Sequence, residues 1–310
     1  MKRLLVGAAV AGMLAVAAAF SRTDSSLPLT DLRVQTEERN PWNHLRLNNH
    51  PDEFRFAIVS DRTGGHRPGV FERAVEQLNL LQPEFVVSVG DLIEGGAKKE
   101  SAKVDQEWKE FNGFIAKLQM PFFYVPGNHD LSNAAAKKKW QDQFGRRYYH
   151  FVYRNVLFLL LDSEDPPGHK INSGHLGDEQ IAYAKKVLEK NRNVRWTIVA
   201  LHRPIWKNPT ELPKTGWLEV EQELAGRKYT VFAGHIHRYE RFERQGMRYY
   251  QLATTGGSSK MRGTGLGEFD HIVWATMKKD GPLLANIMME GIFAEDIRQP
   301  RIVEAPKATP

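Results

Sequence analysis

The chain has 310 residues, of which 41% are hydrophobic and 26% charged, and it contains no cysteine. This length and apolar content suit one large globular domain, because single domains above 200 residues are common. The missing cysteines exclude disulfides, thiol nucleophiles and thiolate metal ligands. The formal net charge of +6 is typical of an ordinary soluble surface, and nucleic-acid binding does not follow from it.

The first residues predict export. Lys2 and Arg3 precede an apolar run that ends at Phe20 and carries an Ala-x-Ala cleavage pattern near its end. These features are typical of a secretory signal peptide, whereas an uncleaved anchor needs a longer apolar stretch. We therefore expect a signal peptide over 1–20 and a mature protein that is periplasmic or secreted, without stable membrane insertion.

The rest of the chain predicts an α/β domain over 53–298, after a polar leader over 21–52. In chain order, apolar spacing predicts a strand over 54–60, a helix over 70–81, a strand over 85–89, a helix over 108–118, strands over 122–125 and 156–161, a helix over 178–190, and strands over 196–201 and 229–233. Such alternation is typical of α/β proteins with buried central strands. Gly-interrupted segments from Tyr239 to about Glu290 predict mostly antiparallel strands, and the Pro-rich tail over 299–310 is expected to be loose.

Five predicted strands end next to a side chain that can bind a metal ion: Asp61, Asp91, Asn128, His202 and His235. Ligands of open α/β sheets bind at the carboxyl edge of the strands, because the loops converge there. Two metal ions that share a carboxylate can activate water and stabilise a phosphoryl transfer. Oxygen and imidazole ligands without sulfur favour Mn, Fe, Mg or Zn. These side chains could instead serve only in helix capping and loop hydrogen bonding.

The motifs at these strand ends resemble those of a known family. In order they are Ser60-Asp61, Gly90-Asp91-Leu-Ile-Glu94, Gly127-Asn128-His129-Asp130, Leu201-His202 and Gly234-His235-Ile-His237. From Phe54 to about Gly257 the chain thereby resembles the calcineurin-like metallophosphoesterases, a family that includes the purple acid phosphatases. The resemblance implies a four-layer αββα sandwich with mixed β-sheets. It also implies metal-dependent hydrolysis of a small-molecule or lipid phosphate ester, as a phosphomonoesterase or phosphodiesterase, with no nucleic acid as partner.

The resemblance assigns residues to a site for two divalent or trivalent metal ions, expected to be Mn, Fe or Zn. The implied metal ligands are Asp61, Asp91, Asn128, His202, His235 and His237. Asp91 would bridge the two ions. His129 would lie beside them and donate a proton to the leaving oxygen or stabilise charge, and Asp130 would support its loop.

One departure from the family pattern concerns the first motif. The family usually has Asp-x-His there, whereas this chain has Asp61-Arg62-Thr63. Purple acid phosphatases use a Tyr three residues after the bridging Asp, and this chain has Glu94 at that position. Three roles for Glu94 stay open: a metal ligand, a carboxylate that orients His129, or a purely structural side chain. His66 could replace the lost ligand, although a solvated loop histidine is the more common case.

The sequence also leaves a non-catalytic function and the roles of three side chains open. The chain could be a pseudoenzyme of the same fold that holds one metal and binds phosphate or a partner, but retention of His129 and of both histidines in Gly-His-x-His argues against this. Arg62 and Arg203 could bind a phosphate as forks or form structural pairs. Trp206 could line a substrate pocket.

Overall fold

The computed structural model describes residues 39, 41–43, 47–48, 50–166, 174–289, 291–294 and 297–302. The chain divides into two units, Met1–Pro51 and Asp52–Pro310, and the second contains all the described helices and strands. The predicted signal peptide and most of the predicted leader lie outside the described residues. Among the described residues, no helix is long and apolar enough to cross a membrane.

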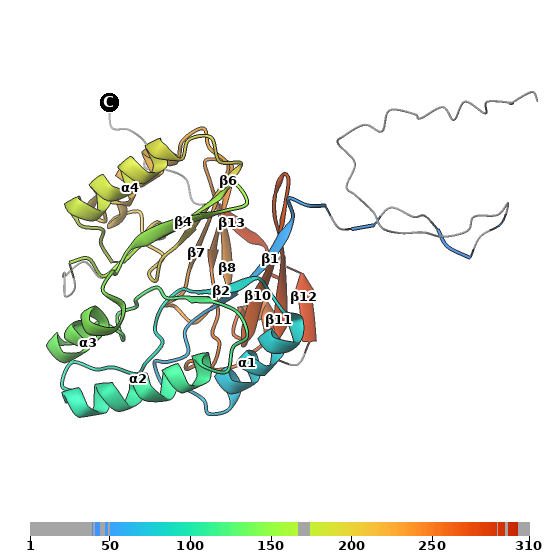
Figure 1. The fold of residues 1–310 in the computed structure, drawn as a ribbon. Coiled ribbons are helices and arrows are strands. Elements are labelled where there is room, and N and C mark those ends of the chain that lie inside the picture. Colours follow the sequence, from blue (N-terminus) through green and yellow to red (C-terminus); the bar gives the residue numbers. More distant parts are fainter. Residues whose placement is uncertain are drawn as a thin grey trace, which may run out of the picture. The chain divides into compact units, whose positions relative to one another are not determined.

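Two mixed β-sheets form the centre of the second unit (Figure 1). The first has the spatial order β12 (Gly291–Ala294), β11 (Gly281–Met288), β10 (His271–Lys278), β1 (Phe54–Val59), β2 (Phe85–Ser88) and β3 (Phe122–Phe123). The second has the order β13 (Pro300–Ile302), β8 (Glu240–Arg244), β9 (Met247–Gln251), β7 (Tyr229–Ala233), β6 (Trp196–Ala200), β5 (Val156–Leu160) and β4 (Tyr149–Tyr153). Strands β1, β2 and β3 run parallel to one another, and so do β5, β6 and β7.

The helices cover the outer faces of the two sheets (Figure 1). Their bounds are α1 (Val70–Leu81), α2 (Ser101–Ile115), α3 (Ala134–Phe144), α4 (Asp178–Lys190) and α5 (Trp217–Leu224), with short 3₁₀ turns η1 (Leu212–Lys214) and η2 (Thr264–Leu266). One buried cluster joins the first sheet to α1, α2 and α3, and another joins the second sheet to α4 and α5. These contacts give the four-layer αββα sandwich that the resemblance implies.

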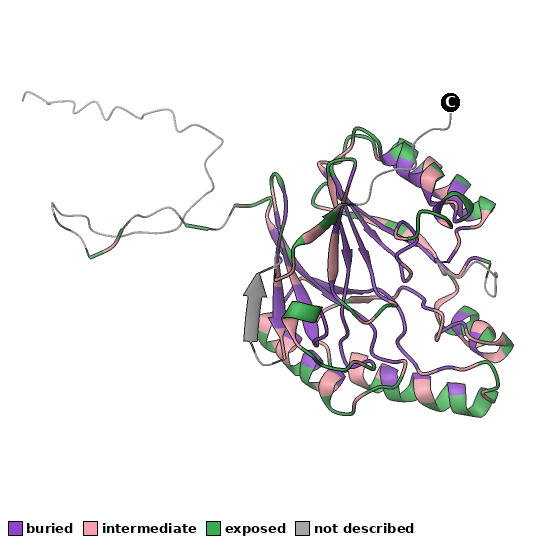
Figure 2. Cartoon of the chain, turned by 180° about the vertical axis from the view of Figure 1, so that it is seen from behind, coloured by how far each residue is buried: buried purple, intermediate pink, exposed green. Residues whose placement is uncertain are grey.

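Alternation along the central strands places apolar side chains on both faces. In β1, Phe54 and Phe56 pack between the sheets. The ring of Phe56 contacts that of Phe158 in β5 edge to face, with 5.1 Å between the ring centroids. Ala57 and Val59 point the other way and pack in the cluster beneath the helices. Because both faces of these strands are buried, their sequence is almost continuously apolar. The buried residues in Figure 2 accordingly follow the central strands.

The predicted elements agree with the structure where burial is strongest. The bounds of α1, α4 and β7 match the prediction, and β1, β2, β5 and β6 differ at their ends only. Sequence analysis missed β4, whose residues alternate between intermediate and exposed positions, and α3, which buries only Ala136 and Trp140. Neither element has a strong apolar pattern.

The predicted loose tail begins with a strand. Pro300–Ile302 form β13, which pairs in parallel with Arg241–Glu243 of β8. The prediction is wrong for these residues, because a short strand at a sheet edge needs hydrogen-bonding partners rather than an alternating apolar pattern. The remainder of that tail, 303–310, lies outside the described residues.

Candidate metal centre

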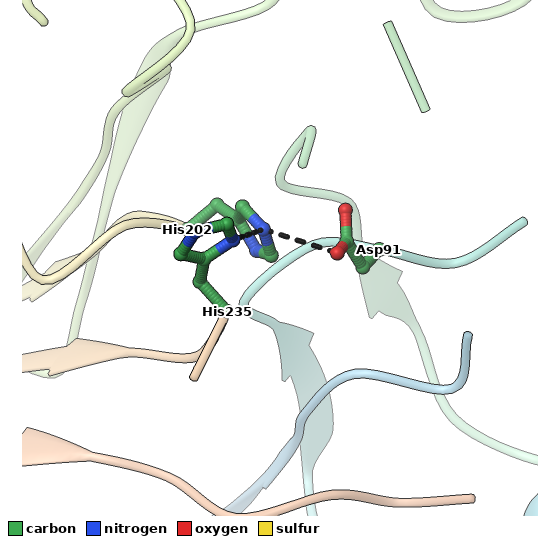
Figure 3. Close-up of side chains that lie close together, drawn as sticks. All are labelled: Asp91, His202 and His235. Atoms are coloured by element: carbon green, nitrogen blue, oxygen red, sulfur yellow. Dashed lines mark hydrogen bonds and ion pairs between the residues drawn. The ribbon is translucent and has the colours of Figure 1, made fainter. Parts of the chain in front are cut away.

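The predicted ligands lie together at one edge of the sandwich. Asp61, Asp91 and Asn128 follow β1, β2 and β3 of the first sheet, while His202 and His235 follow β6 and β7 of the second. Parallel strands bring their carboxyl ends to one edge, and the two sheets present these edges to each other. Figure 3 shows Asp91, His202 and His235 converging from three separate loops.

Two groups of side chains able to hold a metal ion share Asp91. One is Asp91, His202 and His235, the other is Asp61, Asp91 and His237, and the ligand atoms within each group lie within 4.8 Å of one another. His202 Nε2 lies 3.2 Å from Asp91 Oδ2 and 3.0 Å from Asn128 Oδ1. His237 Nε2 lies 3.4 Å from Asp61 Oδ1. The shared carboxylate therefore lies where a bridging ligand is expected.

Main-chain carbonyls orient two of the histidines toward this cluster. His202 Nδ1 contacts the carbonyl of Val89 at 2.9 Å, and His237 Nδ1 contacts the carbonyl of Ser258 at 2.7 Å. A carbonyl only accepts, so Nδ1 donates in both rings, and Nε2 is the nitrogen that faces the carboxylates. Metal-binding histidines are oriented in this way by their second nitrogen. The donor set therefore fits a metal ion.

Main-chain amides fix the two ligand carboxylates. Asp91 Oδ1 accepts from His129 N at 2.9 Å, and Asp61 Oδ1 accepts from His235 N at 2.8 Å. The second bond connects the end of β1 in one sheet to the end of β7 in the other. A Cβ on Gly127 would lie 2.2 Å from Asp91 Oδ1. The glycine of the Gly-Asn-His-Asp motif is thus required by the close approach of the carboxylate.

Three of the ligands have an unusual backbone. Asp91, His235 and His237 have φ angles of 55°, 71° and 54°, in the left-handed region. This conformation is uncommon for residues other than glycine, and such strain is concentrated at functional sites. Here it turns the side chains at the strand ends into the cluster.

The charges of the cluster are strongly coupled. Burial disfavours the anion of Asp91, but the charge and hydrogen bond of His202 outweigh it and hold the pKa of Asp91 below its usual range. Burial likewise opposes the cation of His202, yet Asp91 raises the pKa of His202 to about 9. Burial and the charges of His202 and Arg203 lower the pKa of His235 to about 3. Burial also opposes the anion of Asp61, but its hydrogen bond to His237 and the charges of His202 and His237 together lower the pKa of Asp61. Anionic Asp61 and Asp91 are the forms that bind metal.

His129 and Asp130 lie beside the cluster with different contacts. His129 Nδ1 lies 2.5 Å from the carbonyl of Glu94, so it donates there and leaves Nε2 available. Asp130 is buried and accepts from the amides of Leu92, Ile93 and Gly127 at 2.9, 3.1 and 2.8 Å. Burial and the charge of Asp91 raise the pKa of Asp130 to about 7. Asp130 thus links the Asp91 loop to the His129 loop.

The side chain of Glu94 contacts neither the ligands of the cluster nor His129. Its carboxylate accepts from the amides of Gly65 and His66, the latter at 2.7 Å, and contacts His66 Nδ1 at 3.0 Å. The main-chain carbonyl of Glu94, rather than its carboxylate, contacts His129. Metal binding by this carboxylate and orientation of His129 therefore stay predictions. The contacts observed are with Gly65 and His66 in the loop after Asp61.

Thr63 takes the place of the usual histidine without reaching into the cluster. Its buried hydroxyl lies 3.1 Å from the carbonyl of Asp91 and 2.9 Å from that of Ile93. His66, the possible replacement, contacts Glu94 and belongs to neither ligand group among the described residues. The group at Asp61 therefore has three members.

The two arginines next to ligands differ. Arg62 is 4% exposed, and its guanidinium donates to Glu110 at 2.7 Å and to the carbonyl of Leu92. Arg203 pairs with Glu164 and lies 2.8 Å from His235 Nε2, so its guanidinium borders the cluster. Of the two, only Arg203 contacts a predicted ligand, and the contact with phosphate stays a prediction for both.

A cleft of about 590 Å³ opens over the cluster. Its lining residues are Gly64, Asp91, Asn128, His129, His235, Ile236, His237, Ser258, Ser259, Lys260, Arg262 and Glu268. Sequence analysis missed the contribution of 258–262 and Glu268. The sequence predicted mostly antiparallel strands in this Gly-interrupted region, and nothing in the pattern placed the segment at the carboxyl ends of β1 and β7.

Comparison with known proteins identifies the family. The calcineurin-like phosphoesterase family matches residues 54–239, more than half of the chain. The chain belongs to this family. Every predicted metal ligand lies within the matched residues.

The names of two relatives refer to different phosphate esters. The chain is 29% identical over 196 residues to the serine/threonine-protein phosphatase CPPED1 of Rattus norvegicus, covering 54% of this chain and 58% of that protein. It is 26% identical over 194 residues to the 3',5'-cyclic adenosine monophosphate phosphodiesterase CpdA of Haemophilus influenzae, covering 60% and 65%. The chain thus spans less than two thirds of the length of these curated relatives.

Solved structures show the same fold. A dimetal phosphatase from Danio rerio has a TM-score of 0.58 at 15% identity, covering 79% of this chain and 99% of that one. At such low identity the likeness concerns the fold alone.

Proposed function

We propose that this protein is a metal-dependent hydrolase of phosphate esters with two metal ions. The observation that carries the proposal is the pair of ligand groups that share the carboxylate of Asp91. When bound, two metal ions at such a site supply an activated water and neutralise charge on the phosphate. Family membership supports a phosphate ester as the substrate, and the named relatives include both a phosphatase and a phosphodiesterase.

We infer separate roles in metal binding, proton donation and loop support for the residues of the site. Asp91 would hold both metals, with Asn128, His202 and His235 on one and Asp61 and His237 on the other. His129 would give the proton on Nε2 to the leaving oxygen, because its Nδ1 is already engaged with the carbonyl of Glu94. Asp130 would keep the two loops in register through its three amide contacts.

Metal analysis of the purified protein, combined with assays on p-nitrophenyl phosphate and bis(p-nitrophenyl) phosphate, tests this proposal. We expect two metals per chain and turnover of at least one of the two esters. Asp91→Ala should lower the occupancy of both metals and abolish turnover, whereas the distant surface change Leu283→Ala should do neither. Loss of only one metal from Asp91→Ala would contradict the bridging role.

The alternative is a pseudoenzyme of the same fold that holds one metal and binds phosphate or a partner. The two ligand groups have three members each, so their size does not favour this alternative, which depends only on Thr63 in place of the usual histidine. One metal per chain without turnover of either ester would establish this alternative instead.

A further inference from the structure

A second hollow adjoins the metal cleft. This side pocket, of about 360 Å³, is lined mainly by Pro204, Lys207, Pro209, Ile236 and Arg301. It shares His235 and Ile236 with the cleft, so the two spaces meet at these residues. The surface of the side pocket is largely apolar, in contrast to the polar surface of the cleft.

The exposure of Ile236 is fixed by its neighbours. The left-handed backbone at His235 and His237 turns both imidazoles inward, and the residue between them is 42% exposed. A large apolar side chain is thereby held at the junction of cleft and side pocket. Solvent-exposed apolar surface next to a ligand site indicates contact with an apolar part of the ligand.

The cationic groups around the side pocket have acidic partners. Lys207 Nζ donates to Glu240 Oε2 at 3.0 Å and to Gln251 Oε1 at 2.8 Å. Arg301 Nη1 lies 3.6 Å from Glu240 Oε1. Glu240 pairs with both cations but supplies only one negative charge, so the rim of the side pocket keeps a positive charge. The apolar wall formed by Pro204, Pro209 and Ile236 suits an uncharged organic group.

We propose that the side pocket binds the apolar organic group, alkyl or aryl, of the phosphate ester whose phosphate lies over the metal cluster. This inference rests on the proposed function and adds the class of substrate to it. Ile236 and Pro209 would then determine specificity, because they contact the organic group rather than the phosphate. Trp206, which the sequence offered as a pocket residue, is fully buried and contributes no surface there.

Binding of the n-alkylphosphonates from methyl to hexyl to the metal-loaded protein, measured by titration calorimetry, tests the proposal. These probes keep the charged group and vary only the chain, and they are not hydrolysed. A fully buried methylene contributes up to roughly fourfold in affinity, so the partly enclosed side pocket should favour hexyl over methyl by about tenfold or more. Ile236→Ser and Pro209→Ser should each reduce this ratio, whereas Leu283→Ser on the surface of β11 should preserve it.

The outcomes separate the two proposals. Equal affinity across the series, or a chain-length gain that survives both Ile236→Ser and Pro209→Ser, would overturn the side-pocket inference. Turnover of p-nitrophenyl esters would leave the proposed function standing in either case. Failure to bind any phosphonate, together with no ester turnover, would overturn both. Pro209 lies on an exposed loop and is not adjacent in the chain to any predicted ligand, so its variant is informative even if Ile236→Ser disturbs the neighbouring histidines.

Discussion

The imidazole of His129 is positioned by main-chain groups. Its own amide donates to Asp91 Oδ1 at 2.9 Å, and its Nδ1 contacts the carbonyl of Glu94 at 2.5 Å. The first contact ties the residue to the shared carboxylate without using the side chain. Support of the Asp91 carboxylate and the proposed proton donation would therefore use different parts of the same residue.

We expect His129→Ala to retain near-normal metal content and to lower turnover by about 10²–10⁴, the usual range for a general acid. The amide contact with Asp91 survives this change, and only the proton donor is lost. The loss should be smaller for esters with good leaving groups, as measured by comparing p-nitrophenyl phosphate with an alkyl phosphate. Equal losses on both esters would mean that His129 stabilises charge instead.

Glu94 acts on a different loop through its carboxylate. We expect Glu94→Ala to keep full metal content and to accelerate hydrogen exchange at the amides of Gly65 and His66, because both lose their acceptor. Turnover should fall less than in His129→Ala, since the carbonyl that contacts His129 remains. If one metal per chain is lost from Glu94→Ala, its carboxylate is a ligand after all.

At the scale of elements, glycines allow the strand-end loops to approach one another. Gly127→Ala places a Cβ 2.2 Å from Asp91 Oδ1, so the carboxylate or its loop must shift. We expect lower metal content and a loss of roughly 1–3 kcal/mol in the free energy of unfolding. Gly113→Ala in α2 is the matched control, because its Cβ would have no neighbour within 4 Å. It should stabilise the protein by about 0.5–1 kcal/mol. Normal metal content in Gly127→Ala would refute the steric argument.

The pairing of β10 with β11 includes a buried histidine. His271 Nδ1 contacts Asn286 Oδ1 at 2.7 Å, and His271 Nε2 accepts from the amide of Ala253 at 3.2 Å. The ring is therefore neutral in the folded state, and burial lowers the pKa of His271 to about 4. Between this value and the unfolded value of 6.5, the unfolded chain binds more protons.

This histidine makes stability depend on pH in a defined direction. Its contribution should be complete above pH 6.5 and decline as the pH falls toward 4, by roughly 3 kcal/mol in total. Denaturant unfolding of the wild type and of His271→Gln at both ends of this window measures it. The variant should lack this part of the decline, and parallel pH curves for the two proteins would disprove the assignment.

On the scale of the whole molecule, the two sheets are connected at the site. Asp61 accepts from His235 N, and His202 contacts the carbonyl of Val89, so each sheet provides a group that fixes a ligand of the other. A metal held by ligands from both sheets binds the folded state selectively. Binding of this kind adds about 3 kcal/mol at a free metal concentration 100 times the Kd.

We therefore expect chelator-treated protein to melt at a lower temperature, and Mn²⁺ or Zn²⁺ to restore the loss. Scanning calorimetry with increasing metal measures this effect. Asp91→Asn should respond much less, because the shared ligand has lost its charge. A melting temperature independent of metal would contradict the joining of the two sheets through the ligands.

The sequence predicted those parts that depend on strong burial. The apolar runs of β1, β2, β6 and β7 located the strand ends, and the polar residue after each run located the site. Side-chain direction could not be predicted in the same way. From the motif we predicted that the Glu94 carboxylate binds a metal or orients His129. In the structure this carboxylate accepts a hydrogen bond from the amide of Gly65. The contact of the Ser258 carbonyl with His237 and the lining of the side pocket could not be predicted either, because they bring together residues that are distant in sequence.

Strand β13 determines where the chain can be shortened. Because the sequence predicts a loose tail, the residues after Gln299 would be removed in a shortened protein designed from the sequence alone. Removal would uncover the hydrogen-bonding groups along β8 and replace an edge strand of 3 residues with one of 5 residues, at which a second molecule could add a strand. It would also take Arg301 from the side pocket. An expression clone that ends at Gln299 should therefore be more prone to aggregation and altered in substrate preference, and a clone that extends beyond Ile302 avoids both problems.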